Sequence, residues 1–411
     1  QAVAGGVRTP VAGCGGVNLW TPARCLQKTD GLTGGQPTAQ DQTIPEAHQT
    51  GQPVSHELFW CRSFFRRITP PTLLLLQDEA MAARYRVIIS DFQHGSAEIE
   101  QRILGDLAHV EALEVTSEEQ MWGRADDADA IMVYHTIKIS QATIERLTNC
   151  KLIVRCGVGY DNVDHQFARS RGIPVANVPD YGTEEVADSA IGLTLALTRG
   201  IAYQNTLLRD PQVPWHYDHV RPLRRLRGET FAILGLGRIG TAAAVRAKAL
   251  GMNVIFYDPY KSDGYDKALG LKRVETLDEL LAEAYVLSCH CPLSPETHHI
   301  IDAAAIAKMP KGSYVVNTSR GGVVDVAAIP DAIASGQLAG AGIDVLPQEP
   351  PPADHPLVAA WRDPQHPAHH RVILNAHNAF YSESGLRDMR VKGAEACRRA
   401  LLGQPLRNVV N

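Results

Sequence analysis

Short runs of aliphatic and β-branched residues alternate with segments of helical periodicity along the chain from residue 84 onward. The runs predict strands, and the segments between them predict helices. This alternation is typical of βαβ units and a parallel sheet. In the first part of the series we expect strands at 86–90, 130–133, 152–155 and 174–176, and helices at 98–107, 140–147 and 164–171.

A second series follows an apolar-periodic segment at 184–199, which predicts a helix that could connect two domains. This series lies in the middle of the chain, so we expect the flanking segments to form a second domain. A cleft between two such domains is a common place for a ligand. Strands are expected near Phe231, Val254, Val286, Tyr314, Ala341 and Val372, and a last long helix at 383–402.

The first eighty residues lack this periodicity and are rich in Gly, Pro, Gln and Thr. The first methionine is Met81, directly before the first expected strand. We therefore expect residues 1–80 to be a non-native or upstream-translated extension that is largely disordered. The alternative is a genuine regulatory arm, and a native N-terminus upstream of Met81 in mass spectrometry would favour it.

Composition narrows the class of protein. The 411 residues are enough for two or three domains with their own cores. A formal net charge of −5 gives no reason to expect nucleic-acid or membrane-surface binding. No apolar run approaches the ~20 residues that span a bilayer. The eight cysteines show no paired framework, so reduced thiols in a cytoplasmic protein are the expectation.

A glycine-rich turn carries the most specific chemistry. The expected strand at 230–234 runs into Gly235-Leu236-Gly237-Arg238-Ile239-Gly240 and opens a helix, and Asp258 ends the next strand. This combination predicts a dinucleotide site, because the glycines let the backbone approach a pyrophosphate at a helix N-terminus. Asp258 would bind a ribose and repel a 2′-phosphate, which favours NAD over NADP. The alternative is an ordinary tight turn, with Arg238 solvated rather than near a phosphate.

Three polar residues stand at or after the ends of later strands: Arg320, Glu349 and His377. Strand ends in an open α/β sheet line the ligand crevice, so these residues can converge there. Each also has a structural alternative. Arg320 could form a surface ion pair, Glu349 could be a solvated loop acid, and His377 could be a hinge histidine bonded to the backbone.

Ordered motifs extend this pattern from about Tyr85 to the C-terminus. On these motifs the chain resembles the D-2-hydroxyacid dehydrogenase family, most closely its C-terminal-binding-protein branch. The resemblance implies an α/β fold in which a central Rossmann domain (181–374) is inserted in a smaller flavodoxin-like substrate domain (84–180 and 375–411), with a cleft between them. The motifs are RCGVGYDNVD (155–164), NVP (177–179), EEVADS (184–189), the glycine turn, YDPY (257–260), NTSRGG (317–322), GIDV (342–345), QEP (348–350), HNAFYS (377–382) and LRNVVN (406–411).

The resemblance also implies catalytic roles. Arg320 would grip the substrate carboxylate and carbonyl, which suits a guanidinium because its donors meet carboxylate oxygens in pairs. His377 would be the general acid and base at the 2-oxo oxygen, and Glu349 would hydrogen-bond its imidazole. The backbone N–H groups of Val158 and Gly159 would bind the substrate carboxylate.

Two more residues, Arg155 and Phe380, would line the substrate side of the cleft, although hinge packing is an equal alternative for Phe380.

The segment Cys289-His290-Cys291 could suggest a zinc fragment, but no second ligand pair follows, so no metal is expected. Thr297-His298-His299 could likewise suggest metal ligands, but adjacent histidines rarely point at one ion, and Thr297 is expected to cap a helix instead. The implied cofactor-binding set is Gly235, Gly237, Arg238, Ile239, Gly240, Asp258, His290, Pro292, Thr297, Thr318, Ser319, Arg320, Asp344 and His377.

The expected function is NAD-dependent interconversion of a small D-2-hydroxy acid and its 2-oxo acid. The resemblance also implies a homodimer formed through the cofactor domain. The alternative is a dinucleotide-sensing binding protein, because animal members of the same branch act as transcriptional co-repressors while keeping the catalytic residues. NADH binding without turnover would favour this alternative.

Overall fold

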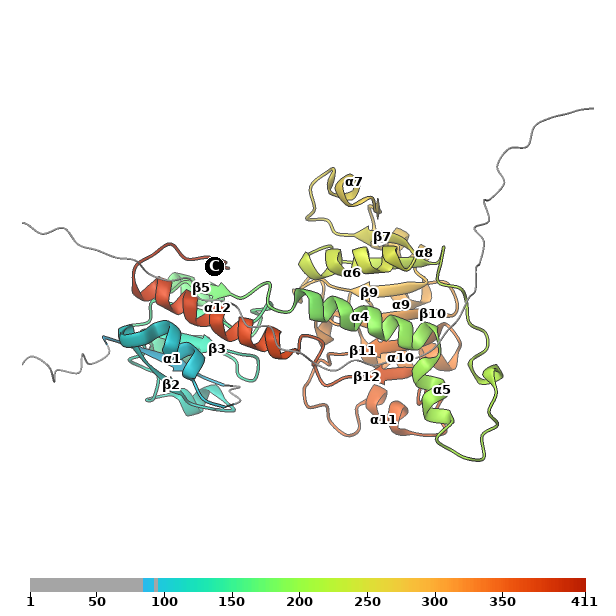
Figure 1. Ribbon diagram of the computed structural model, residues 1–411, viewed down its shortest axis with the longest axis horizontal. Coiled ribbons are helices and arrows are strands. Elements are labelled where there is room, and N and C mark those ends of the chain that lie inside the picture. The colour runs from blue at the N-terminus through green and yellow to red at the C-terminus, as the bar shows by residue number, and fades with distance from the viewer. Residues whose placement is uncertain (1–83, 92–94) are drawn as a thin grey trace, which may run out of the picture. The chain divides into compact units, whose positions relative to one another are not determined.

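The computed structural model describes residues 84–91 and 95–411, which form two lobes, each built on its own parallel sheet (Figure 1). The expectation for residues 1–80 lies outside the described residues. The strands are β1 (Tyr85–Ile89), β2 (Ala108–Ala112), β3 (Ala130–Val133), β4 (Ile153–Arg155), β5 (Val175–Asn177), β6 (Thr230–Leu234), β7 (Asn253–Tyr257), β8 (Lys272–Arg273), β9 (Val286–Cys289), β10 (Ser313–Asn317), β11 (Leu338–Ile343) and β12 (Val372–Leu374).

Helices follow most of these strands, as the periodicity predicts. No helix in the described part of the chain is long and apolar enough to cross a membrane. The α-helices are α1 (Glu98–Leu104), α2 (Gln141–Arg146), α3 (His165–Ser170), α4 (Thr183–Thr198), α5 (Ile201–Leu207), α6 (Arg238–Ala249), α7 (Tyr265–Leu269), α8 (Leu277–Glu283), α9 (Ala303–Ala307), α10 (Ile329–Ala334), α11 (Pro356–Arg362) and α12 (Glu383–Leu401).

The first lobe holds a sheet with the strand order β2-β1-β3-β4-β5. This is the flavodoxin-like order, which confirms the predicted fold of this part. The periodicity did not predict β2, whose sequence is AHVEA. It is an edge strand with two polar residues among five, and it begins directly after a helical turn, so its pattern is too short to separate from the preceding helix.

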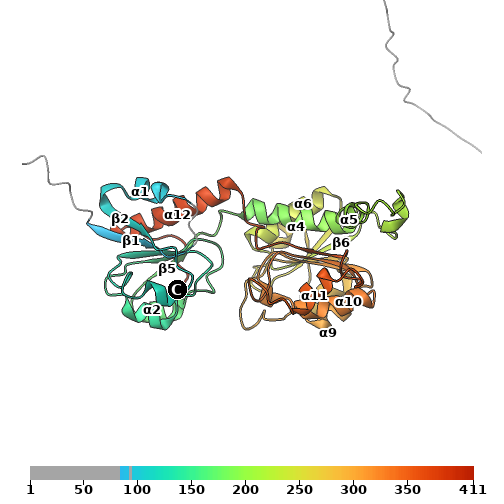
Figure 2. The ribbon, with the colours of Figure 1, turned by 90° about the horizontal axis from the view of Figure 1, so that it is seen from below.

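The second lobe holds a seven-stranded sheet with the order β12-β11-β10-β9-β6-β7-β8. All of its paired strands are parallel, and the order in which strands are added reverses between β6 and β9, as it does in a Rossmann fold. Helices cover both faces of the sheet (Figure 2). Successive residues of β6 therefore enter different cores: Ala232 and Leu234 on one face, Phe231 and Ile233 on the other. Burial on both faces explains why these strands are continuous apolar runs.

The chain returns to the first lobe after β12. Helix α12 packs against α1 and against β3 and β4. Beyond it, Val410 donates a backbone hydrogen bond of 2.9 Å to Val175, and Asn177 donates one of 3.1 Å to Asn408. The first lobe therefore consists of two separate stretches of sequence with the second lobe inserted between them, as the predicted fold requires.

Candidate functional site

The glycine turn between β6 and α6 has the geometry of a phosphate cradle. Gly235 has a φ of 90°, and a Cβ there would lie 2.7 Å from the backbone nitrogen of Cys291. A Cβ on Gly240 would lie 2.2 Å from the carbonyl oxygen of Gly235. A Cβ on Gly237 would meet nothing within 4 Å, so the backbone there faces open space. Helix α6 begins at the exposed Arg238, and its N-terminal N–H groups suit a diphosphate.

Asp258, directly after β7, is fixed next to this turn. One carboxylate oxygen accepts the backbone N–H of Leu236 at 2.8 Å, and the other accepts that of Tyr260 at 3.0 Å. Each oxygen keeps a second lone pair. The side chain can therefore accept ribose hydroxyls while it remains anchored.

The loop after β9 also fits a dinucleotide. His290 lies 2.8 Å from the Ser288 hydroxyl through Nε2, while its Nδ1 is buried without a partner among the described residues. The Thr318 hydroxyl is buried without such a partner too. Burial lowers the pKa of His290 to about 4, so the ring is neutral. Buried polar atoms of this kind are normally satisfied by a ligand or water, which is consistent with a bound dinucleotide.

The helix cap predicted for Thr297 is wrong. Thr297 lies in a turn, where its hydroxyl donates to the Pro292 carbonyl at 2.6 Å and accepts the Ser294 N–H at 2.8 Å. The hydrogen bonds that a threonine makes at a cap are here used to close the turn. No group of three or more His, Cys, Asp or Glu in the described ranges is placed to hold a metal ion.

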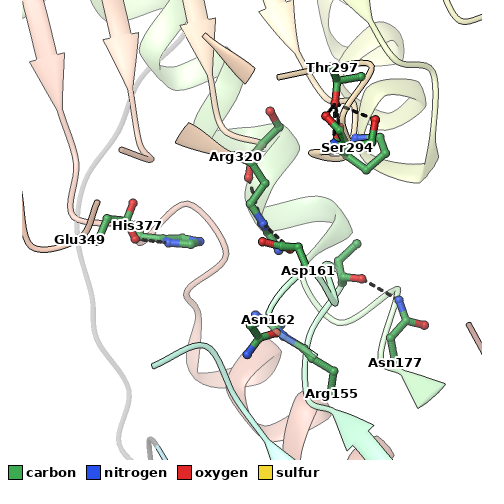
Figure 3. A network of polar contacts seen from close by, with 12 residues as sticks. Arg155, Asp161, Asn162, Asn177, Ser294, Thr297, Arg320, Glu349 and His377 are labelled. Carbon is green, nitrogen blue, oxygen red and sulfur yellow. Dashed lines mark hydrogen bonds and ion pairs between the residues drawn. The ribbon is translucent and has the colours of Figure 1, made fainter. Parts of the chain in front are cut away.

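The predicted catalytic residues follow three neighbouring strands. Arg320 comes after β10, Glu349 after β11 and His377 after β12, and these strands pair in that order. Glu349 Oε2 and His377 Nδ1 are 2.7 Å apart (Figure 3). Burial alone would raise the pKa of Glu349, but the hydrogen bond and charge of His377 lower it below the usual value. An ionised Glu349 therefore orients the imidazole through its Nδ1 edge.

Asp344 holds the backbone that carries this histidine. Its carboxylate accepts the N–H groups of Asn378 and Ala379, both at 3.0 Å, and its carbonyl accepts the His377 N–H at 2.8 Å. His377 has a φ of 52°, a left-handed conformation that is uncommon outside glycine. Burial raises the pKa of Asp344. Contact of Asp344 and of Ser319 with the cofactor stays a prediction.

Arg320 is bound by a residue that the sequence did not single out. Its Nε donates to Asp161 Oδ1 at 3.0 Å (Figure 3). Its Nη1 donates to the Ser319 carbonyl at 2.9 Å. Asp161 belongs to the loop after β4, in the first lobe. The sequence signal that could have identified Asp161 is its position in the motif at 155–164, two residues after Gly159.

The same loop presents the other predicted substrate contacts. The N–H groups of Val158 and Gly159 donate no hydrogen bond to any described residue, while Asn177 donates to the Val158 carbonyl at 2.6 Å. Arg155, at the end of β4, is buried, and its Nε has no partner in the described part of the chain. Burial, and then the charge of Arg320, lower the pKa of Arg155. A carboxylate would satisfy these donors.

His135 is a second residue that the sequence did not single out. It follows β3, and its ring lies 5.7 Å from that of His377 and 6.3 Å from that of Phe380. Phe380 also contacts Tyr181, with ring centroids 5.9 Å apart. Asp91 fixes the loop that carries His135 by accepting the N–H of its neighbour Thr136 at 2.7 Å. Polar residues after strand ends tend to line the ligand crevice, so a search after the strands of the first sheet could have found His135.

Comparison with known proteins agrees with this geometry. Residues 191–379 match the NAD-binding domain of the D-isomer-specific 2-hydroxyacid dehydrogenases. The chain belongs to the D-isomer-specific 2-hydroxyacid dehydrogenase family. The cofactor of the second lobe is therefore NAD, as the glycine turn and Asp258 predict.

Relatives in this family carry different names. C-terminal-binding protein 1 of Caenorhabditis elegans is 33% identical over 74% of this chain and 42% of its own length. D-3-phosphoglycerate dehydrogenase of Methanocaldococcus jannaschii is also 33% identical, over 79% of this chain and 59% of its own length. The structure of D-lactate dehydrogenase from Aquifex aeolicus, complexed with NAD and lactic acid, matches with a TM-score of 0.68 at 27% identity, over 77% of this chain and 96% of that one.

Proposed function

We propose that the protein is an NAD-dependent dehydrogenase that interconverts a D-2-hydroxy acid and its 2-oxo acid. The observation that carries the proposal is the 2.7 Å pair of His377 and Glu349 on the strand ends next to Arg320. An imidazole oriented by a carboxylate can move a proton, and a guanidinium can bind an anionic substrate. The family membership and the names of two relatives support the same reaction class.

Each residue has a role in this reaction. The glycine turn and Asp258 would hold NAD, which when bound would supply the exchange of a hydride at C2 of the substrate. Nε2 of His377 gives a proton to the 2-oxo oxygen during reduction and takes one from the hydroxyl during oxidation. Glu349 stabilises the protonated ring. Arg320 binds the carboxylate.

The loop of the first lobe completes the substrate site. The open N–H groups of Val158 and Gly159 add donors for the carboxylate. Arg155 and Phe380 would line the side of the site that faces the substrate, and the His135 ring lies 6.3 Å from that of Phe380. Phe380 and His135 would therefore limit the size of the substrate side chain.

The test is turnover of NADH with a panel of 2-oxo acids, from glyoxylate and pyruvate to hydroxypyruvate and bulkier aryl acids. The His377→Ala protein is the control, and it should still bind NADH but lose about 10²–10⁴-fold in rate, the usual contribution of a general acid. Retained turnover in this variant would remove His377 from the acid–base role. NADH binding by the unmodified protein without turnover of any acid would favour the sensing alternative.

We also propose that the protein is a homodimer. Trp215, 86% exposed, and Tyr217, 61% exposed, lie on one segment of the second lobe. Apolar side chains exposed to this extent favour an interaction surface. Light scattering should give twice the 44.7 kDa mass of the chain, and Trp215→Ser should shift the equilibrium toward the monomer. A monomeric unmodified protein would contradict the proposal.

A further inference from the structure

The guanidinium of Arg320 is fixed by two of its three nitrogens. Nε donates to Asp161 and Nη1 to the Ser319 carbonyl, at 3.0 and 2.9 Å. Nη2 lies against Gly159, where an added Cβ would be only 1.7 Å away. The third nitrogen therefore points to the loop whose N–H groups at Val158 and Gly159 are open. One substrate carboxylate could meet both sets of donors.

Asp161 is the carboxylate that sets this orientation. Among the described residues, Asp161 is the ion-pair partner of Arg320. This ion pair joins a residue of the first lobe to a residue of the second. Burial would raise the pKa of Asp161, but the charge and hydrogen bond of Arg320 lower it below its usual value, so it is ionised. The next residue, Asn162, anchors the loop by donating to the Tyr134 and Ile137 carbonyls, each at 2.9 Å.

An ionised carboxylate next to an anion-binding arginine has an electrostatic disadvantage, because it repels the incoming substrate. The same group fixes the guanidinium before the substrate arrives, and preorganised donors bind more tightly than mobile ones. These two effects have opposite signs. Removal of Asp161 strengthens carboxylate binding if repulsion dominates and weakens it if orientation dominates.

We propose that Asp161 is a positioning residue that aims the Arg320 guanidinium at the Gly159 loop, so that both bind one substrate carboxylate. This role rests on the proposed dehydrogenase function, and it adds a contact between the lobes that would form part of the substrate site. Asp161 transfers no proton and need not touch the substrate.

The test uses the full chain with Asp161→Ala and Asp161→Asn. Asp164→Asn is the matched control, because it makes the same charge change in the same loop but caps α3 through the Phe167 N–H instead of contacting Arg320. Three quantities are measured: KM and kcat for the best 2-oxo acid, and the dissociation constant of oxalate from the NADH complex. Oxalate reproduces the carboxylate and neighbouring oxygen of a 2-oxo acid.

Asp161→Ala should raise KM and the oxalate dissociation constant about tenfold, as expected for loss of one hydrogen bond between charged groups, and change kcat much less. Asp161→Asn keeps an acceptor oxygen, so its KM and oxalate dissociation constant should lie between those of Asp161→Ala and the unmodified protein. Asp164→Asn should leave both values unchanged. NADH affinity should be the same in all variants. Unchanged affinity also shows that the variants are folded.

Equal or tighter oxalate binding in Asp161→Ala would overturn the proposal, because repulsion would then be the larger effect. Equal losses in Asp161→Ala and Asp164→Asn would overturn it too, since any charge change in the loop would suffice. Absence of turnover in the unmodified protein would contradict the proposed function, and oxalate binding would still decide the role of Asp161.

Discussion

His377 occupies a left-handed backbone conformation, with a φ of 52°, that is uncommon outside glycine. A positive φ in a residue other than glycine costs about 1 kcal/mol or more. Three hydrogen bonds to Asp344 offset this cost, two to its carboxylate and one to its carbonyl. The conformation places Nδ1 of His377 at Glu349, so the local strain serves the pair that we propose to be catalytic.

We also expect the choice between NAD and NADP to depend on one residue, Asp258. Asp258→Asn keeps an oxygen for the Leu236 N–H but removes the charge that would repel a 2′-phosphate. We expect the NADH/NADPH ratio of kcat/KM to fall about tenfold, equivalent to ~1.4 kcal/mol. Asp263→Asn, an exposed change in the following loop, should leave the ratio unchanged. An unaltered ratio in Asp258→Asn would show that another group selects NAD.

Helix α12 shows how one element completes the first lobe. It follows the last strand of the second lobe, yet its buried residues join the core formed by β1, β3 and β4. Arg390 on this helix donates two hydrogen bonds of 2.7 Å to Glu100 of α1, whose side chain is fully buried. A buried carboxylate requires such a partner, because an uncompensated charge in the interior is strongly destabilising.

Arg390→Leu should therefore lower the free energy of unfolding by about 3 kcal/mol, since it leaves Glu100 buried and unpaired. Lys392→Met on the same helix removes more exposed pairs with Asp180 and Asp388 and should cost less than about 1 kcal/mol. Urea denaturation of both variants measures the difference. Equal losses would mean that the burial of Glu100 does not matter.

At the scale of the whole molecule, the two lobes have separate cores. Residues of β1 to β5 contribute to two clusters, and residues of β6 to β12 contribute to two others. The predicted NAD contacts lie almost entirely in the second lobe, whereas the loop with Val158, Gly159 and Asp161 lies in the first. Each lobe can therefore respond separately to a ligand.

We expect calorimetry of the full chain to resolve two unfolding transitions. NADH should raise the midpoint temperature of only the transition that belongs to the second lobe. At one hundred times the dissociation constant the stabilisation is about 2.7 kcal/mol. Arg390→Leu should lower the midpoint temperature of only the other transition, so the two changes together assign each transition to a lobe. A single transition that both changes move together would show that the lobes unfold as one unit.

Much of the site was predictable because its signals are local in sequence. The glycine turn and Asp258 form one βαβ unit, and Arg320, Glu349 and His377 each follow a strand in the chain. Asp161 was missed because its importance depends on Arg320 in the other lobe, and His135 was missed because only the strand ends of the second sheet were considered. Thr297 was misassigned because a cap and a closed turn use the same hydroxyl hydrogen bonds.

The sequence by itself determined the alternation of strands and helices, the dinucleotide turn and the family, because each is written in patterns of a few consecutive residues. Only the tertiary structure decided that β2 joins the first sheet and that Asp161 meets Arg320. Those contacts join residues far apart in the chain, as Asp161 and Arg320 are, and no local pattern encodes a distance in space.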